Sequence, residues 1–165
     1  MKYIIFSISH ITRVVGILAF TVFLLGAAEV TAQCEGSLSV EKNRNSRSAD
    51  EDGAMFWLEL KNTSSRSQTY MLSYETLKEA CGNAAYGERG PNVTLNVAIG
   101  EGQQRSNGYT VRAGQTARVM VLVTVPEGTP INRWSCIEMK AATEACTNSP
   151  LTTTLNVFVP DPSQG

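Results

Sequence analysis

Four cysteines are the residues of this 165-residue chain with the widest choice of chemistry. Cysteine thiolates can act as nucleophiles, bind metals or pair as disulfides. The only histidine, His10, lies in an apolar N-terminal segment, and the sequence has no C-x-x-C motif. Catalysis by Cys–His or Ser–His–Asp, zinc bound by histidine and pH switching by histidine are therefore excluded for the rest of the chain. The cysteines are Cys34, Cys81, Cys136 and Cys146.

Disulfide pairing is the chemistry that we expect of these cysteines. An even number of cysteines in an exported chain favours two disulfides, for which three connectivities are possible. Cys136 and Cys146 would close a short local loop, so we expect them to pair with each other. Cys34 would then pair with Cys81. Such a bridge typically stabilises a fold by about 2–4 kcal/mol, mainly by restricting the unfolded chain.

Acidic residues offer a second kind of chemistry. Asp50, Glu51 and Asp52 form an acidic cluster, and hard cations such as calcium take oxygen ligands from loops of this kind. The cluster lacks the alternate spacing of an EF-hand loop, so we expect a solvated loop and keep a weak calcium site as the alternative. A retaining hydrolase would need two carboxylates about 5 Å apart. The candidates are Glu59, Glu75, Glu79, Glu88 and Glu138, and most lie in patterns typical of solvated surface.

Three aromatic residues could form a binding surface: Trp57, Tyr109 and Trp134. Large rings also pack well in a core, and we expect that role for one or more of the three. We expect no cofactor and no resident metal.

The N-terminal segment has the three zones of an export signal. Residues 1–13 contain two cations and no acid, and the fifteen residues 14–28 are apolar apart from Thr21. The last residues before position 33 are small or β-branched, as a signal peptidase requires. A signal core is typically ~7–15 residues long, whereas a membrane-spanning helix needs ~20. We therefore expect cleavage between Ala32 and Gln33.

Two alternatives to cleavage remain open. Residues 1–32 could stay attached as an apolar helix that anchors the chain in a membrane. Cys34 could instead be lipid-modified, although the residue before such a cysteine is normally small and here it is Gln33.

The charge of the remaining chain argues against nucleic acid as a partner. Without residues 1–32 the chain has 12 cations and 14 acids, a net charge near −2. No basic stripe is present that could neutralise phosphates.

Alternating apolar and polar residues predict the elements that must position these groups. The clearest pattern is Val119, Val121, Val123 and Val125, which would share one face of a strand that Pro126 ends. Residues 41–53 are polar and predict a solvated loop, residues 76–81 could form one helical turn, and residues 160–165 a frayed tail. We expect strands at residues 34–40, 55–61, 68–74, 92–99, 109–112, 116–125, 132–142 and 151–159.

Seven or eight short strands with turns between them predict an all-β fold, an antiparallel immunoglobulin-like β-sandwich over residues 33–159. Residues 58–63 (LELKNT), residues 109–116 (YTVRAGQT), the valine strand and residues 125–129 (VPEGT) follow one another in a recognisable order. This order resembles bacterial immunoglobulin-like or fibronectin-III-like accessory domains of exported proteins, related to the alpha-galactosidase-associated NEW3 domains. The resemblance spans residues 36–159 and implies a non-catalytic role in spacing, adhesion or assembly. Two features depart from such domains: four cysteines, and no larger module beside the sandwich.

We therefore expect an exported, non-catalytic structural or interaction module of the cell envelope, located in the periplasm, on the cell surface or outside the cell. Its partner would be another envelope protein or a glycan surface, and a membrane only if the N-terminal helix is retained. The alternatives are a membrane-anchored accessory subunit of an envelope complex and a small hydrolase that uses carboxylates.

Cleavage of the N-terminal segment is directly testable. We expect the mature chain to begin at Gln33, because the apolar run matches a signal core in length. Intact-mass and N-terminal peptide mass spectrometry of the purified protein would measure this. A chain that keeps residues 1–32 would instead support the membrane-anchored subunit.

Overall fold

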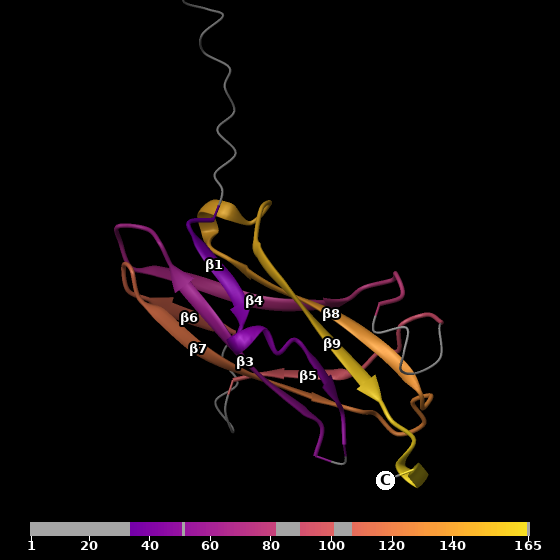
Figure 1. The fold of residues 1–165 in the computed structure, drawn as a ribbon. Helices are drawn as coiled ribbons and strands as arrows, with labels where there is room; N and C mark the ends of the chain where they lie inside the picture. The colour runs from indigo at the N-terminus through magenta and orange to yellow at the C-terminus, as the bar shows by residue number, and fades with distance from the viewer. Residues whose placement is uncertain (1–33, 51, 82–89, 101–106, 165) are drawn as a thin grey trace, which may run out of the picture. The chain divides into compact units, whose positions relative to one another are not determined.

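Two β-sheets face each other in the computed structural model, which describes residues 34–50, 52–81, 90–100 and 107–164 (Figure 1). The described residues form nine strands. Sheet A has the order β1 (Gly36–Val40), β3 (Ala54–Asn62), β7 (Thr116–Thr124) and β5 (Asn96–Ile99). Sheet B has the order β2 (Ser46–Ser48), β9 (Leu151–Val159), β8 (Arg133–Ala142), β4 (Gln68–Thr76) and β6 (Gly108–Val111). The predicted all-β sandwich is confirmed, with more strands than expected.

The predicted period-two patterns build the core between the sheets. In sheet A, Phe56, Leu58 and Leu60 of β3 are buried, and so are the valines of β7 at positions 119, 121 and 123. In sheet B, β4 buries Tyr70 and Leu72, β9 buries alternate residues, and β8 does so from Ile137 onward, with the disulfide-bonded Cys136 buried as well. Each large apolar side chain removed from water contributes about 1.5–3 kcal/mol. The alternation therefore determines which face of each strand points inward.

One strand pair contradicts the expectation of a purely antiparallel sandwich. Strand β2 lies in the stretch predicted to be a solvated loop and pairs in parallel with β9, with Arg47 opposite Val157. Ala49 continues this pairing by donating its N–H to the carbonyl of Phe158 at 2.8 Å. The guanidinium of Arg47 lies 5.7 Å from the ring centre of the buried Phe56. The polar residues of β2 therefore form a strand because its backbone pairs with a sheet edge, which needs no apolar side chains. A short 3₁₀ helix, η1 (Glu41–Asn43), precedes it.

The segment after β4 also differs from expectation. No helical turn forms in the described part of residues 76–81, because β4 continues to Thr76 and Leu77 then donates its N–H to the carbonyl of Cys136 at 2.8 Å. The predicted strand at 92–99 is shorter, since β5 begins at Asn96. Val93 instead donates its N–H to the carbonyl of Trp134 in sheet B at 3.0 Å, so the chain first follows β8 and only then enters sheet A.

The C-terminal tail is more regular than expected. The predicted tail contains a short 3₁₀ helix, η3 (Pro162–Gln164), at which the Asp161 carboxylate accepts hydrogen bonds from the N–H and the hydroxyl of Ser163. The predicted N-terminal apolar helix lies outside the described residues. Within those residues, no helix has the length and apolar character needed to cross a membrane.

A buried amide connects the two sheets. Asn62 ends β3 and has no exposed surface. Its Nδ2 donates to the carbonyls of Arg66 at 2.7 Å and Val111 at 2.9 Å. Its Oδ1 accepts the N–H of Ser64 at 2.9 Å and lies 3.4 Å from the hydroxyl oxygen of Tyr70, whose one hydrogen is donated over the shorter distance to the Glu35 carbonyl. Three of the four hydrogen-bonding positions of the amide are therefore used, and they join sheet A, the β3–β4 turn and sheet B.

We expect Asn62→Ala to lower the free energy of unfolding by about 2–4 kcal/mol, because it leaves buried partners of the amide without hydrogen bonds. Denaturant unfolding at neutral pH would measure the change. Asn96→Ala is the matched control, since Asn96 is exposed on β5, and it should change the free energy by less than about 0.5 kcal/mol. Equal effects of the two substitutions would contradict this role of Asn62.

Candidate functional site

Two disulfides form, but with a different connectivity from the one we expected. Cys34 pairs with Cys146 and Cys81 with Cys136, at Cα–Cα distances of 5.2 and 6.0 Å. The expected Cys136–Cys146 pair fails because Cys136 lies within β8. The extended strand from there to Ala142 carries the chain about 20 Å away before the turn that contains Cys146. Closeness in sequence is therefore no guide to pairing when a strand separates two cysteines.

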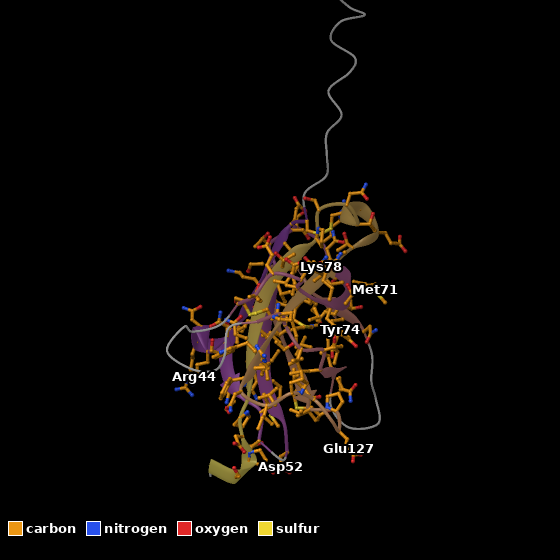
Figure 2. The ribbon with its side chains drawn as sticks, turned by 90° about the vertical axis from the view of Figure 1, so that its right-hand side faces the viewer. Arg44, Asp52, Met71, Tyr74, Lys78 and Glu127 are labelled. Carbon is orange, nitrogen blue, oxygen red and sulfur yellow. A yellow bond between two sulfur atoms is a disulfide. The ribbon has the colours of Figure 1, made fainter. Side chains whose placement is uncertain are left out.

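The predicted calcium loop has only two of its residues in the described part of the chain. The Oδ1 of Asp50 accepts the N–H of Asp52 at 3.2 Å, and Gly53 donates its N–H to the Asp50 carbonyl at 3.0 Å. Figure 2 shows Asp52 at the lower end of the sandwich, away from Met71 and Tyr74. Glu51 lies outside the described residues, and among those described no three His, Cys, Asp or Glu side chains are grouped to hold a metal. The observed contacts are those of a turn that satisfies its own backbone.

The three predicted aromatic residues do not share one surface. Trp57 lies on β3 in sheet A and alternates with the buried Phe56 and Leu58, so it faces away from the core. Tyr109 lies on β6 and packs against the core. Trp134 lies on β8 in sheet B, where its ring centre is 5.2 Å from that of Phe158. Trp57 and Trp134 therefore each have apolar neighbours on the outward face of their own sheet, Trp134 through Phe158 directly opposite it, but the two faces belong to different sheets.

An apolar row lies on the outer side of sheet A. In the strand register Met55 lies opposite Leu122 of β7, Leu122 lies opposite Ala98 of β5, and Trp57 lies opposite Met120. We call these five residues the outer face of sheet A. Met55 is 45% exposed, and the other four are partly exposed. Clustered apolar side chains on a solvent-facing sheet are typical of interaction surfaces.

Arg118 borders the outer face of sheet A. Its guanidinium lies 4.5 Å from the ring centre of Trp57, within the range of a cation–π interaction, and donates to the Glu41 carboxylate at 2.8 Å. One side of the indole ring is therefore occupied. The sequence pattern could have revealed this border, because Arg118, Met120 and Leu122 alternate with the valines that we assigned to the core.

Two of the carboxylates considered for hydrolysis do come together. Glu75 of β4 lies directly opposite Glu138 of β8, and the Nζ of Lys140 contacts their carboxylates at 3.0 and 3.1 Å. The hydrogen bonds to Glu75 and then to Glu138 raise the pKa of the Lys140 ammonium, which stays charged between them. This arrangement offsets the repulsion of two like charges on an exposed strand pair, which is a structural role.

Tyr70 is a buried titratable residue of the core whose hydroxyl forms a hydrogen bond with the backbone. Its hydroxyl donates to the Glu35 carbonyl at 2.8 Å, so it ties the residues before β1 to β4. Burial raises the pKa of the Tyr70 phenol above its usual range, and the charge of Glu35 raises it further. The phenol is therefore held in its neutral form.

The pKa of Tyr70 is higher in the folded chain than in the unfolded chain, so its neutral form stabilises the fold. This stabilisation is fully present below pH ~10, the pKa of an unperturbed tyrosine, and is lost as the pH rises through the pKa of Tyr70 in the folded chain. We expect the free energy of unfolding to fall more steeply with alkaline pH in the native chain than in Tyr70→Phe. At neutral pH the same substitution should cost about 1–2 kcal/mol for the lost hydrogen bond. Chemical denaturation over a pH series would measure both effects. Tyr74→Phe, an exposed tyrosine of the same strand, should leave the native pH profile unchanged.

Comparison with known proteins gives structural neighbours and no family. No model of a known protein family matches the chain, so the resemblance to NEW3-related domains stays a prediction. No curated protein matches the sequence.

The solved structures that match the chain include PapD-like and MSP domains. The PapD-like domain 7 of human CEP192 is 10% identical, with a TM-score of 0.43 over 82% of this chain and 94% of that domain. WR4, an MSP family member of C. elegans, is 7% identical, with a TM-score of 0.40 over 77% and 99% of the two chains. The E. coli chaperone DraB is 13% identical, with a TM-score of 0.43 over 78% of this chain and 56% of DraB. The chain thus has PapD-like and MSP immunoglobulin-like β-sandwiches as its structural neighbours.

Proposed function

We propose that this chain is an exported, non-catalytic β-sandwich that binds another protein of the cell envelope through the outer face of sheet A. The observation on which this rests is the apolar row itself. Met55, Leu122 and Ala98 stand side by side on three neighbouring strands, with Trp57 and Met120 beside them. Removing such a row from water is favourable by about 25 cal/mol for each Å² buried.

A non-catalytic role fits the chemistry of the described residues. The four cysteines are paired as disulfides, and the sequence has no histidine after His10. Disulfides persist in oxidising compartments, which supports a location in the periplasm, on the cell surface or outside the cell. An accessory domain of the NEW3-related kind would be a β-sandwich with a non-catalytic role.

The composition of the outer face of sheet A favours a protein over a glycan as partner. Glycans are commonly bound by stacking on an open aromatic ring, and Arg118 already covers one side of Trp57. Methionine side chains are flexible and polarizable, which suits contact with another protein surface. The Arg118–Glu41 pair at the border offers charges of both signs to the rim of such an interface.

We expect Met55→Glu to abolish partner binding, because it places a charge in the apolar row at its most exposed residue. A photo-crosslinking residue at position 55, used in native envelope fractions and read by mass spectrometry, would identify the partner. Met71→Glu is the matched control: Met71 is 56% exposed on β4 of sheet B and should retain binding.

Equal loss of binding in Met55→Glu and Met71→Glu, with unchanged melting temperatures, would contradict the assignment to sheet A. Crosslinks from position 55 to a glycan, with none to a protein, would replace the protein partner by a glycan surface.

A further inference from the structure

The two disulfides have different surroundings. The Cys34–Cys146 bridge lines a pocket of about 280 Å³ together with Glu35, Arg66 and Gln68. Cys34 is partly exposed there, whereas Cys146 is only 3% exposed. A reagent that approaches this bridge from solvent therefore meets the sulfur of Cys34 first.

The sulfur of Cys146 is surrounded by hydrogen-bond donors. The backbone N–H of Thr143 donates to it at 3.3 Å, and the Thr143 hydroxyl lies 3.2 Å away. A disulfide sulfur has no hydrogen, so the hydroxyl must be the donor in this contact. Both hydrogen bonds strengthen when the sulfur becomes a thiolate, because bonds to a charged acceptor are about twice as strong as bonds between neutral groups.

The sulfur of Cys34 has the opposite surroundings. It lies 3.8 Å from the carbonyl oxygens of Ala141 and Cys146, which disfavour a negative charge on this atom. Once Cys34 is a thiol, however, its S–H can donate a hydrogen bond to these oxygens. The four contacts together predict which sulfur leaves as a thiolate, namely Cys146, and which one becomes a neutral thiol, namely Cys34.

We propose that Cys34–Cys146 is a reducible exchange site for an exported dithiol protein, attacked at Cys34 with Cys146 as the leaving group. The thiolate of the dithiol protein forms a bond to the Cys34 sulfur, the Cys34–Cys146 bond breaks, and the electron pair goes to Cys146. In the mixed disulfide, the second thiol of the dithiol protein then attacks the first sulfur of that same protein. This releases Cys34 as a thiolate, which takes up a proton. The dithiol protein ends as a disulfide, and this chain has gained two electrons.

The position of the bridge allows this exchange without loss of the sandwich. Cys34 precedes β1, and Cys146 lies in the 3₁₀ helix η2 (Glu144–Cys146) between β8 and β9, so neither residue belongs to a strand. The hydroxyl of Tyr70 still holds Glu35 after reduction. The Cys81–Cys136 bridge differs in this respect, because Cys136 is fully buried within β8.

Glutathione buffers of graded reduced-to-oxidised ratio would test the proposal on the purified protein, with acid quenching, alkylation and peptide mass spectrometry of each cysteine. We expect Cys34–Cys146 to open at a less reducing ratio than Cys81–Cys136, with the circular dichroism of the sheets retained. The trapped glutathione adduct should be on Cys34.

Substitution of Thr143 tests whether the hydrogen bonds to the Cys146 sulfur, and not only the exposure of Cys34, determine how readily the bridge is reduced. Thr143→Val removes the hydroxyl donor and should make reduction of Cys34–Cys146 less favourable by about tenfold. Thr143→Ser should restore the native equilibrium, and Thr147→Val, an exposed threonine just after η2, is the matched control.

Opening of both bridges at one ratio, an adduct on Cys146, or equal behaviour of Thr143→Val and Thr147→Val would each overturn the proposal. The adduct position is read on the native sequence, so it decides the direction of attack even if a variant fails to fold.

Discussion

The interaction on which the rest of the sandwich depends is the buried amide of Asn62. Contacts between leucine and valine side chains are not directional, so a core made of them alone would allow the two sheets to slide past each other with the same kind of contacts. Asn62 removes this freedom, because its three hydrogen bonds reach the β3–β4 turn and the Val111 carbonyl of β6 in the opposite sheet. A buried amide with an unmet hydrogen bond is costly, so this register of the sheets is favoured over its neighbours.

The parts of the fold that could be predicted are those in which a local pattern decides the outcome. The valines of β7 and the alternating residues of β3 determine a strand and its inward face within nine residues each. Strand β2 could not be predicted in this way, because Ser46–Ser48 are exposed and pair through their backbone with a strand that lies far along the chain. Val93 likewise alternates with its neighbours but bonds to sheet B, which no local pattern records.

The site could be predicted less well than the fold, since it depends on distances between remote residues. The presence of two disulfides followed from the cysteine count, but the partner of Cys34 depends on where η2 brings Cys146 after β8. Part of the outer face of sheet A could have been predicted from the sequence. Met120 and Leu122 alternate with the valines of β7, whose inward face we predicted correctly, so they must lie on the outward face of that strand. What the pattern could not supply is that Met55 and Ala98 stand on either side of Leu122.

The bridge between Cys34 and η2 also determines how the sandwich would respond to mechanical load. Strand β1 is an edge strand bonded to β3 alone within sheet A, and tension applied at its first residue would unzip that ladder one hydrogen bond at a time. Because the bridge precedes β1, tension from the N-terminal side passes instead through covalent bonds to the loop before β9, which is flanked on both sides by paired strands. Strand β1 is thereby shielded from peeling, and reduction of that one bond would transfer the full load to it.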